Sequence, residues 1–350
     1  MLFLLLEKQS TNYARNNNDL SGWTKITGTD TISLNAGTSP DGTANGINLI
    51  PSTANGNHMF YDGSTSVASS GNFTMTCYAK ANGYSKFSMR ESASVGYYAS
   101  FNLSNGTVLD NGGNTASIEN LGNGWYRCIL SVVASTSVQI GLLVLSDSYT
   151  SGQPFGLTWS GDGTKGILTY GAQLEVSSSY ATSLISTAGG ASATRVADAC
   201  FKTGISSLIG QSQGTIFIDA VMKPTAGGYD CIMSVNDGTF ANSVNVFTNP
   251  TQDYYFEIYS GGVVQATGMF GALPATRIKF AVAWNSTNSV FYVNGSLLNT
   301  SSSITTPSGM GSFNFSGPSN SYTMGKKEVN QFLSFTTRLT NAELASLTTL

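Results

Sequence analysis

Phe73-Thr74-Met75-Thr76-Cys77-Tyr78-Ala79-Lys80 is the stretch that decides the fold class, because apolar and polar side chains alternate along it. Alternation with a period of two places one set of side chains on each face of a β-strand. Similar runs occupy residues 86–90, 97–103, 125–133, 138–145, 214–222, 231–235, 243–247, 254–259, 278–284 and 290–293. Clusters of Gly, Asn, Asp and Ser separate the runs, which indicates short antiparallel strands joined by turns.

Length and composition indicate two β domains. A chain of 350 residues exceeds what one core usually serves, and 41% hydrophobic residues suffice for two cores although only 10% of residues are charged. Residues 177–198 are rich in Ser, Ala, Thr and Gly, which favours a surface-packed connection there. We therefore expect an all-β protein of two tandem antiparallel β-sandwich (jelly-roll) domains, residues 1–185 and 199–350, with minimal helix.

Local signals add detail to this prediction. Asn294-Gly295 favours a tight type I′ hairpin, and Asn105-Gly106 gives the same signal in the first half. Only residues 203–210 and 340–350 look helical. The second stretch begins with Thr340 followed three residues later by Glu343, which is the pattern of a capping box.

Charge and hydropathy exclude several classes of function. The net charge is −3 and the only basic pair is Lys326-Lys327, whereas phosphate binding needs many clustered Lys and Arg side chains. We expect no nucleic-acid partner. The apolar run at residues 1–6 is too short for a membrane span or a signal peptide, so we expect a buried strand, no membrane insertion and no secretion by the ordinary route.

The side chains of common catalytic and metal sites are scarce. His58 is the only histidine, and we expect a surface or strand-edge position for it. No glutamate begins an E-x-D-x-x-E pattern, so the sequence predicts neither a catalytic residue nor a metal site. Cys77 and Cys128 sit on the apolar side of their strands and are expected to be buried free thiols, with a Cys77–Cys128 disulfide as the alternative.

Asp-Gly-Thr occurs three times, beginning at Asp41, Asp162 and Asp237. Asp-Gly is a turn former, so we expect turns here, with calcium loops as the alternative.

Carbohydrate binding without chemistry remains open to this composition. It needs aromatic faces for sugar C–H groups and Asn or Asp side chains for hydroxyl groups. The candidate ligand-binding residues are Tyr97, Tyr98, Tyr229, Asp230, Asp237, Asp253, Tyr254 and Tyr255. The alternative for each tyrosine is a core or cross-strand position.

Several motifs together resemble a carbohydrate-binding-module-like sandwich found in bacteriophage tail and virion proteins. They begin with residues 4–12, Trp23-Thr24-Lys25 and Pro40-Asp41-Gly42-Thr43. Later motifs are residues 101–107, Gly122-Asn123-Gly124-Trp125-Tyr126-Arg127, Gly161-Asp162-Gly163-Thr164, Gly171-Ala172-Gln173-Leu174-Glu175 and Thr194-Arg195-Val196-Ala197-Asp198. From about Gly214 the chain resembles a laminin-G-like or concanavalin-A-like jelly roll, with marks at residues 214–218, 282–285, 291–295 and 339–344.

The resemblance implies a virion protein: a head fibre, tail fibre or capsid decoration exposed on a particle assembled in the host cytoplasm. Its partners would be other virion proteins and host-surface glycans, in a homo-oligomer without cofactors. Two alternatives stay open, a purely structural docking protein and a glycan-degrading tail enzyme.

Overall fold

The computed structural model describes residues 4–63, 67–68, 71–91, 96–133, 137–176, 180–223, 228–271, 277–318, 322 and 325–350. Within these residues the chain is built from antiparallel strands with one short α-helix, so the all-β prediction is confirmed. No helix in the described part of the chain is long and apolar enough to cross a bilayer.

The chain divides into two compact units, and one interrupts the sequence of the other. The inserted unit is Ser10–Arg195, and the split unit combines Met1–Gln9 with Val196–Leu350. This division differs from the expected ranges 1–185 and 199–350 in a simple tandem order. Residues 180–187, which we expected to belong to a surface connection, contribute the buried side chains of Tyr180, Thr182, Ile185 and Thr187 to the inserted unit.

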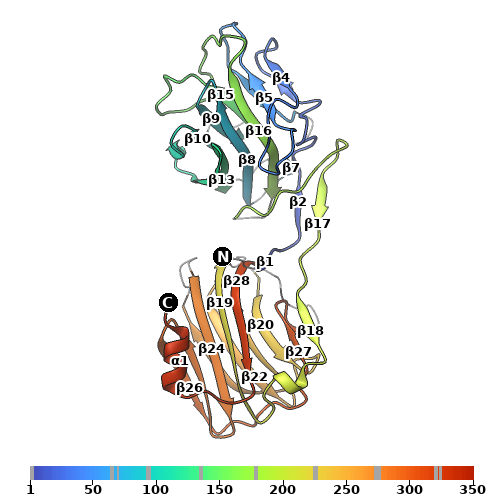
Figure 1. Cartoon of the computed structure of the whole chain (residues 1–350), viewed down its shortest axis with the longest axis vertical. Coiled ribbons are helices and arrows are strands. Elements are labelled where there is room, and N and C mark those ends of the chain that lie inside the picture. Colours follow the sequence, from blue (N-terminus) through green and yellow to red (C-terminus); the bar gives the residue numbers. More distant parts are fainter. Residues whose placement is uncertain are drawn as a thin grey trace. The chain divides into compact units, whose positions relative to one another are not determined.

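Two six-stranded sheets form the inserted unit (Figure 1). One sheet has the order β11 (Thr107–Asp110), β10 (Tyr98–Asn102), β9 (Lys86–Glu91), β15 (Ile140–Leu145), β6 (Met59–Tyr61), β3 (Thr24–Lys25). The other has the order β12 (Thr115–Gly122), β13 (Trp125–Val133), β8 (Asn72–Asn82), β16 (Gly166–Val176), β5 (Ile47–Ile50), β4 (Thr31–Ser33). Two short ribbons pair β14 (Ser137–Val138) with β7 (Val67–Ala68) and β17 (Ala193–Arg195) with β2 (Ser10–Asn12).

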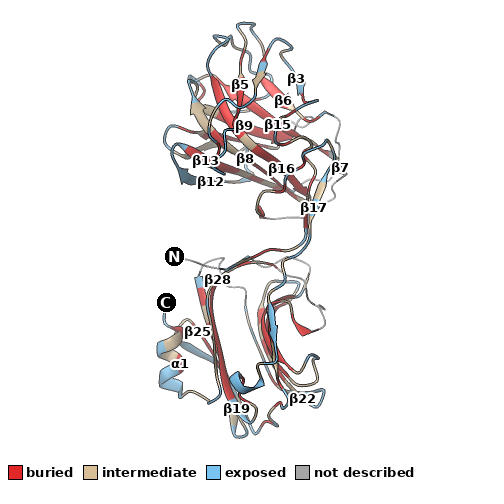
Figure 2. Ribbon diagram, turned by 45° about the vertical axis from the view of Figure 1, so that its right-hand side comes forward, coloured by how far each residue is buried: buried red, intermediate tan, exposed pale blue. Residues whose placement is uncertain are grey.

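The split unit also has two six-stranded sheets. One has the order β1 (Leu4–Leu6), β28 (Lys326–Phe335), β19 (Gln213–Lys223), β24 (Arg277–Asn285), β25 (Asn288–Val293), β26 (Ser296–Ser302). The other has the order β18 (Phe201–Thr203), β27 (Ser312–Asn314), β20 (Asp230–Asn236), β21 (Ser243–Thr248), β22 (Tyr254–Ser260), β23 (Val263–Phe270). Buried residues concentrate on the strands of each unit (Figure 2).

The sheet that contains β24 is covered on its outer face by a helix. Helix α1 (Asn341–Thr348) buries Leu344 against Phe217, Ala281 and Tyr292. Its N-terminus has the predicted capping box, in which the Thr340 hydroxyl accepts from the Glu343 amide and the Glu343 carboxylate accepts from the Thr340 amide. The other expected helix is only a 3-10 turn, η1 (Ser206–Leu208), since three residues do not make an α-helical turn.

The two Asn-Gly signals give hairpins of different kinds. Asn294 and Gly295 have φ values of 48° and 83° between β25 and β26, as a type I′ turn requires. Between β10 and β11 only Gly106 has a positive φ, 68°, and its amide donates to the Asn102 carbonyl. The second loop is longer because residues 103–106 all lie outside the strands.

Buried polar groups attach the ends of the inserted unit to its sheet. The Glu175 carboxylate is fully buried and accepts from the Ser10 and Thr182 hydroxyls and, at 2.8 Å, from the Gln173 amide. The Asn12 side chain donates to the Ile185 carbonyl at 2.9 Å. The motifs around residues 10–12 and 171–175 therefore have a structural role, which is to satisfy backbone and side-chain polar groups where the chain enters and leaves the unit.

Cys77 and Cys128 are opposite each other in the register of β8 and β13, and both are buried free thiols, as expected. Burial raises the pKa of Cys77 to about 12.

The first strand completes the split unit. β1 pairs antiparallel with β28, with Leu6 opposite Lys327, and the Leu6 side chain joins the hydrophobic core of that unit. The prediction of a buried strand at the start of the chain holds for Leu6, whereas Leu4 is 42% exposed. A strand of three residues has little intrinsic stability, so its position depends on this side chain.

We expect Leu6→Ala to lower the free energy of unfolding of the split unit by about 2–4 kcal/mol, because the variant leaves a cavity in a packed core. Amide hydrogen exchange resolved along the chain, measured with urea unfolding, would show faster exchange in β28 and β19. Leu4→Ala is the matched control and should cost about 1 kcal/mol or less, since this side chain is partly in water. Faster exchange in β8 and β16 instead would contradict the assignment of β1 to the split unit.

Candidate functional site

The outer face of the β18–β23 sheet in the split unit gathers aromatic and polar side chains. Along β22, Tyr254, Phe256 and Ile258 point into the core. Because side chains alternate along a strand, Tyr255, Glu257 and Tyr259 point to the opposite face. All three are half-buried.

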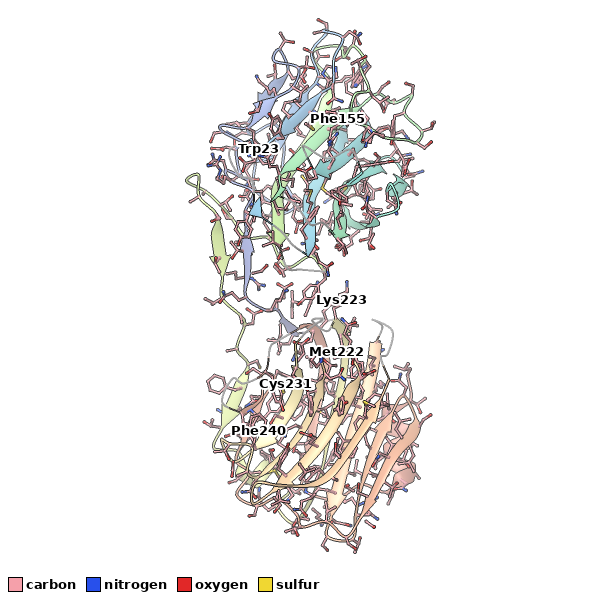
Figure 3. All side chains as sticks on the ribbon, turned by 180° about the vertical axis from the view of Figure 1, so that it is seen from behind. Trp23, Phe155, Met222, Lys223, Cys231 and Phe240 are labelled. Carbon is pink, nitrogen blue, oxygen red and sulfur yellow. The ribbon has the colours of Figure 1, made fainter. Side chains whose placement is uncertain are left out.

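Six aromatic side chains on this face form a cluster outside the main core. The aromatic cluster consists of Tyr229, Phe240, Phe247, Tyr255, Tyr259 and Tyr322. Phe247 lies between two nearly parallel rings, with centroids 5.4 Å from Tyr255 and 5.4 Å from Tyr322. Phe240, in the loop after β20 (Figure 3), meets Tyr322 edge-on at 5.4 Å. Phe247 is therefore the buried centre, and Tyr229, 48% exposed, is the most open member of the part that the structure describes.

A row of polar side chains crosses the same sheet. The strand register places Asn314, Ser234, Asn245 and Glu257 side by side on β27, β20, β21 and β22. The Ser234 hydroxyl donates to the Asn245 Oδ1 at 2.7 Å, and both side chains are fully buried. Asn314 and Glu257, at the two ends of this polar row, are half-buried. The Oδ1 of Asn314 has no hydrogen-bond partner among the described residues, which leaves one acceptor free.

Glu257 is the carboxyl group of this row. Burial raises its pKa above the ordinary value, and a hydrogen bond from the Tyr259 hydroxyl offsets part of the change. In turn, burial and the neighbouring Glu257 raise the pKa of Tyr259 to about 12. Tyr255, Glu257 and Tyr259 thus present a carboxylate between two aromatic rings on one strand.

Of the eight candidate residues from the sequence, two lie in the aromatic cluster. These are Tyr229 and Tyr255. Tyr254 is fully buried and stacks on Phe270 and Phe280 in the core, so its side chain is not accessible to a ligand. Tyr254 points into the core because adjacent residues of β22 point to opposite faces of the sheet, and its neighbour Tyr255 points outward.

The three candidate aspartates do not face a common site. Asp230 is buried at the start of β20. Asp237 and Asp253 accept hydrogen bonds within their own loops, from Thr239 and Asn242 and from Asn249 and Thr251 respectively. The carboxylates of Asp237 and Asp253 therefore stabilise the turns in which they lie.

Tyr97 and Tyr98 belong to the inserted unit. The Tyr97 ring is half-buried and meets Phe73 edge-on at 6.2 Å. Tyr98 is buried, and its hydroxyl forms a hydrogen bond with the Asp110 carboxylate. Neither residue joins the aromatic cluster of the split unit, and burial removes Tyr98 from a binding role.

The candidate residues from the sequence did not include Phe240, Phe247, Tyr259, Tyr322, Asn245 or Glu257. The alternation along residues 254–259 contained a usable signal, since it separates Tyr255, Glu257 and Tyr259 from the core-facing residues. Phe240 and Tyr322 lie in loops, where the alternation of strand side chains does not apply. The sequence pattern therefore does not predict that they contact residues of β21 and β22.

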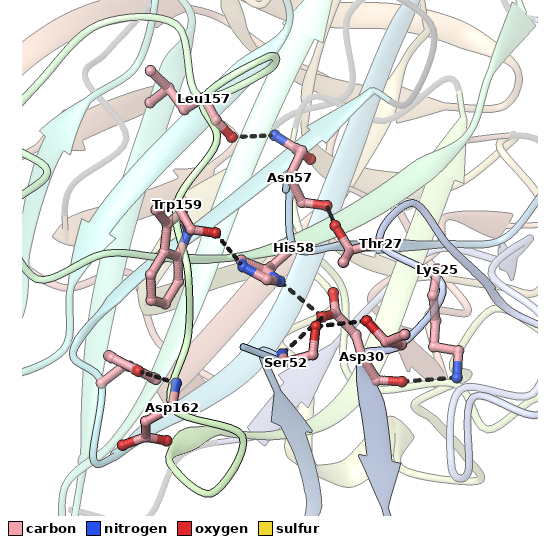
Figure 4. Close-up of polar contacts among 11 residues, drawn as sticks. Lys25, Thr27, Asp30, Ser52, Asn57, His58, Leu157, Trp159 and Asp162 are labelled. Atoms are coloured by element: carbon pink, nitrogen blue, oxygen red, sulfur yellow. Dashed lines mark hydrogen bonds and ion pairs between the residues drawn. The ribbon is translucent and has the colours of Figure 1, made fainter. Parts of the chain in front are cut away.

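His58 directly precedes β6, in keeping with a strand-edge position, but its side chain is buried, so the expected surface position is wrong. Figure 4 shows its polar contacts. Its Nε2 is 2.9 Å from the Trp159 carbonyl oxygen, and its Nδ1 is 2.8 Å from the Asp30 Oδ1. The same Asp30 oxygen accepts from the amide and hydroxyl of Ser52. These hydrogen bonds join residues 30, 52, 58 and 159 in one buried polar contact.

The three Asp-Gly-Thr segments form the same turn. In each, one carboxylate oxygen accepts from the amide and the hydroxyl of the threonine two residues later, with amide distances of 2.8, 2.8 and 2.9 Å. The glycines have positive φ values of 84°, 77° and 96°. The turn prediction is therefore confirmed, and among the described residues no group of three or more His, Cys, Asp or Glu side chains is placed to hold a metal ion.

Comparisons with known proteins give structural likenesses only. No model of a known protein family matches the chain, and no curated protein matches it. Among solved structures, the carbohydrate-binding module CBM40 of a Ruminococcus gnavus sialidase, bound to α2,3-sialyllactose, aligns with 15% identity and a TM-score of 0.35, covering 40% of this chain and 84% of that one.

Two other solved structures align similarly. The NanB sialidase of Streptococcus pneumoniae gives 12% identity and a TM-score of 0.35, over 42% of this chain and 26% of that one. The receptor-binding domain of botulinum neurotoxin type G gives 12% identity and a TM-score of 0.33, over 42% and 45%. Likenesses at these identities and TM-scores carry no functional argument.

Glu257→Gln should raise the melting temperature at neutral pH. A carboxyl whose pKa is raised by folding binds its proton more tightly in the folded state, so stability falls as pH rises from the ordinary pKa to the raised one. The loss is complete above the raised pKa, and the amide variant avoids it. Thermal unfolding from pH 3 to pH 7 would measure this.

Tyr259→Phe is the comparison variant, because it removes the hydroxyl that stabilises the charged form. It should deepen the loss of stability with rising pH. A Glu257→Gln variant that melts lower than the original chain at pH 7 and equally at pH 3 would show that the carboxylate stabilises the fold, contrary to this prediction.

We expect Asp30→Ala to lower the free energy of unfolding of the inserted unit by about 1–3 kcal/mol, because it leaves the buried polar groups of His58 and Ser52 without their hydrogen-bond partner. Chemical denaturation at neutral pH would measure the loss. An Asp30→Ala and His58→Gln double variant should lose less than the sum of the two single variants, since the two residues interact directly. Strict additivity would contradict the pairing.

Proposed function

We propose that the chain is a non-enzymatic attachment protein that binds carbohydrate through the outer face of the β18–β23 sheet. The observation that carries the proposal is the placement of Tyr255, Glu257 and Tyr259 on one strand, with a half-buried carboxylate between two aromatic rings. A sugar offers C–H faces, which pack on aromatic rings, and hydroxyl groups, which donate to carboxylate and amide oxygens.

The surroundings support this use of the face. Tyr229 adds an exposed ring next to Phe247 and Tyr322. Asn245, the cross-strand partner of Glu257, is fully buried and is held by Ser234, so the strand next to Glu257 is fixed before a ligand arrives. Preorganisation of this kind lowers the entropic cost of binding.

The role that we propose for this face of the sheet is non-catalytic. Hydrolysis of a glycosidic bond needs two carboxyl groups on opposite sides of that bond. The polar row of Asn314, Ser234, Asn245 and Glu257 contains one carboxylate, which suits recognition of hydroxyl groups.

We place this attachment protein on a bacteriophage particle, as a head fibre, tail fibre or capsid decoration. The support is the series of motifs in the first half of the chain that resembles virion proteins. On a particle, several copies would act together, and multivalent attachment makes a weak single site sufficient. Its partners are then other virion proteins and host-surface glycans, in a homo-oligomer.

Tyr255→Ala and Tyr229→Ala should each weaken glycan binding about three- to tenfold, because each removes one aromatic contact with a sugar ring. Binding of the full chain would first be located on a glycan array and then measured by calorimetry. Leu298→Ala is the control, since it removes a similarly exposed apolar side chain from the opposite sheet.

An array without signal for the full chain in its native oligomer would overturn the proposal. It would favour the alternative in which the same aromatic surface docks onto another virion protein. Release of reducing sugar from a bound glycan would instead support the enzymatic alternative.

A further inference from the structure

The inserted unit contains a separate pocket on the outer face of the sheet formed by β12, β13, β8, β16, β5 and β4. Its volume is about 620 Å³, within the range of small-ligand sites. One wall is the loop between β4 and β5, at residues 38–42, and the other is the end of β12 with the first turn residue after it, at residues 121–123. Lys80 of β8 and Trp125 of β13, which are cross-strand partners, form its base.

The walls of this pocket are held in place by hydrogen bonds. The Trp125 indole Nε1 donates to the Thr38 carbonyl at 3.0 Å, which ties the loop to the sheet. Asp41 holds the same loop by accepting from Ser39 and Thr43, and from the Tyr170 hydroxyl at 2.8 Å. Through these hydrogen bonds the Asp41 carboxylate stabilises the loop.

Among the described residues that line the pocket, Lys80 is the only one with a charged side chain. No ion pair or hydrogen bond joins its ammonium group to another residue in the described ranges. Gly124 lies beside its methylene chain, since a Cβ at that position would be in ordinary van der Waals contact with the Lys80 Cε at 3.4 Å. As far as the structure describes its lining, the pocket therefore has one cation without a counter-charge.

The other lining groups are neutral and of two kinds. Pro40, Leu121 and the edge of Trp125 are apolar, and Leu121 is 45% exposed. Ser39 and Asn123 are polar, and Asn123 takes a φ of 51° between two glycines that also have positive φ. Two motifs that are far apart in the sequence, at residues 40–43 and 122–127, thus contribute residues to the pocket that contains Lys80.

We propose that this pocket binds an acidic sugar, a ring that carries a carboxylate. Lys80 pairs with the carboxylate, Leu121 and Pro40 contact the C–H faces, and Asn123 bonds to hydroxyl groups. The site is distinct from the aromatic cluster of the split unit, and the proposal does not depend on the function assigned to that cluster.

The test uses methyl β-D-glucuronide and methyl β-D-glucoside as probes of the full chain, with the Trp125 indole N–H and the Leu121 methyl groups followed by NMR. We expect saturable shifts of both signals with the glucuronide, at least tenfold weaker binding of the glucoside, and weaker glucuronide binding at higher salt. A charged hydrogen bond contributes about 1.5–3 kcal/mol, which corresponds to about tenfold or more in affinity.

Lys80→Gln should weaken glucuronide binding at least tenfold, whereas Lys86→Gln, which removes the same charge from β9, should leave it unchanged. Leu121→Asp keeps Lys80 and supplies an internal carboxylate beside it, and this variant should also lose binding. Tyr255→Ala should have no effect on these signals, which separates this site from the proposed glycan-binding face.

Three results would overturn the inference: no shift with either millimolar glucuronide or an oligomeric uronic acid, equal binding of the glucoside, or unchanged binding by Lys80→Gln. Binding of an oligomeric uronic acid but not of the single sugar would keep the site and identify a polysaccharide chain as its source of carboxylates.

Discussion

The alternation of side chains along each strand is the constraint on which the rest of this structure depends. A strand must send successive side chains to opposite faces, so every residue that enters a core leaves its neighbours on the outside. On β22, burying Tyr254, Phe256 and Ile258 forces Tyr255, Glu257 and Tyr259 outward. The candidate binding face is thus a direct consequence of how the core is packed.

The two sheets of the split unit treat their outer faces differently. Helix α1 covers the face that carries Phe217, Ala281 and Tyr292, and this face becomes a second small core. Among the described residues, aromatic side chains cover the other outer face, with Phe247 stacked at its centre and Tyr229 in contact with solvent. Aromatic rings that remain partly exposed on a rigid sheet are suited to binding, because few rotamers are lost when a ligand arrives.

Low charge makes buried polar contacts important in this chain. Only 10% of its residues are charged, and several of these charges are used inside, as in the contact between Asp30 and His58 and in the hydrogen bonds to Glu175. Asp30 meets a histidine 28 residues later in the sequence, and Glu175 also accepts from the hydroxyl of Ser10, at the start of the inserted unit. They contribute to specificity, since an alternative packing would leave a buried charge without a partner.

The sequence by itself determined the fold class, the capping box at Thr340, the Asn294-Gly295 turn and the three Asp-Gly-Thr turns, because each follows from interactions within a few residues. Tertiary structure alone decided that Leu6 completes a sheet with β28, that His58 meets Asp30, and that Phe240 and Tyr322 join Tyr255 on one face. Such contacts depend on which strands become neighbours, and alternation fixes the face of a residue without fixing its neighbours. For the same reason only Tyr229 and Tyr255, of the residues selected from the sequence, lie in the aromatic cluster.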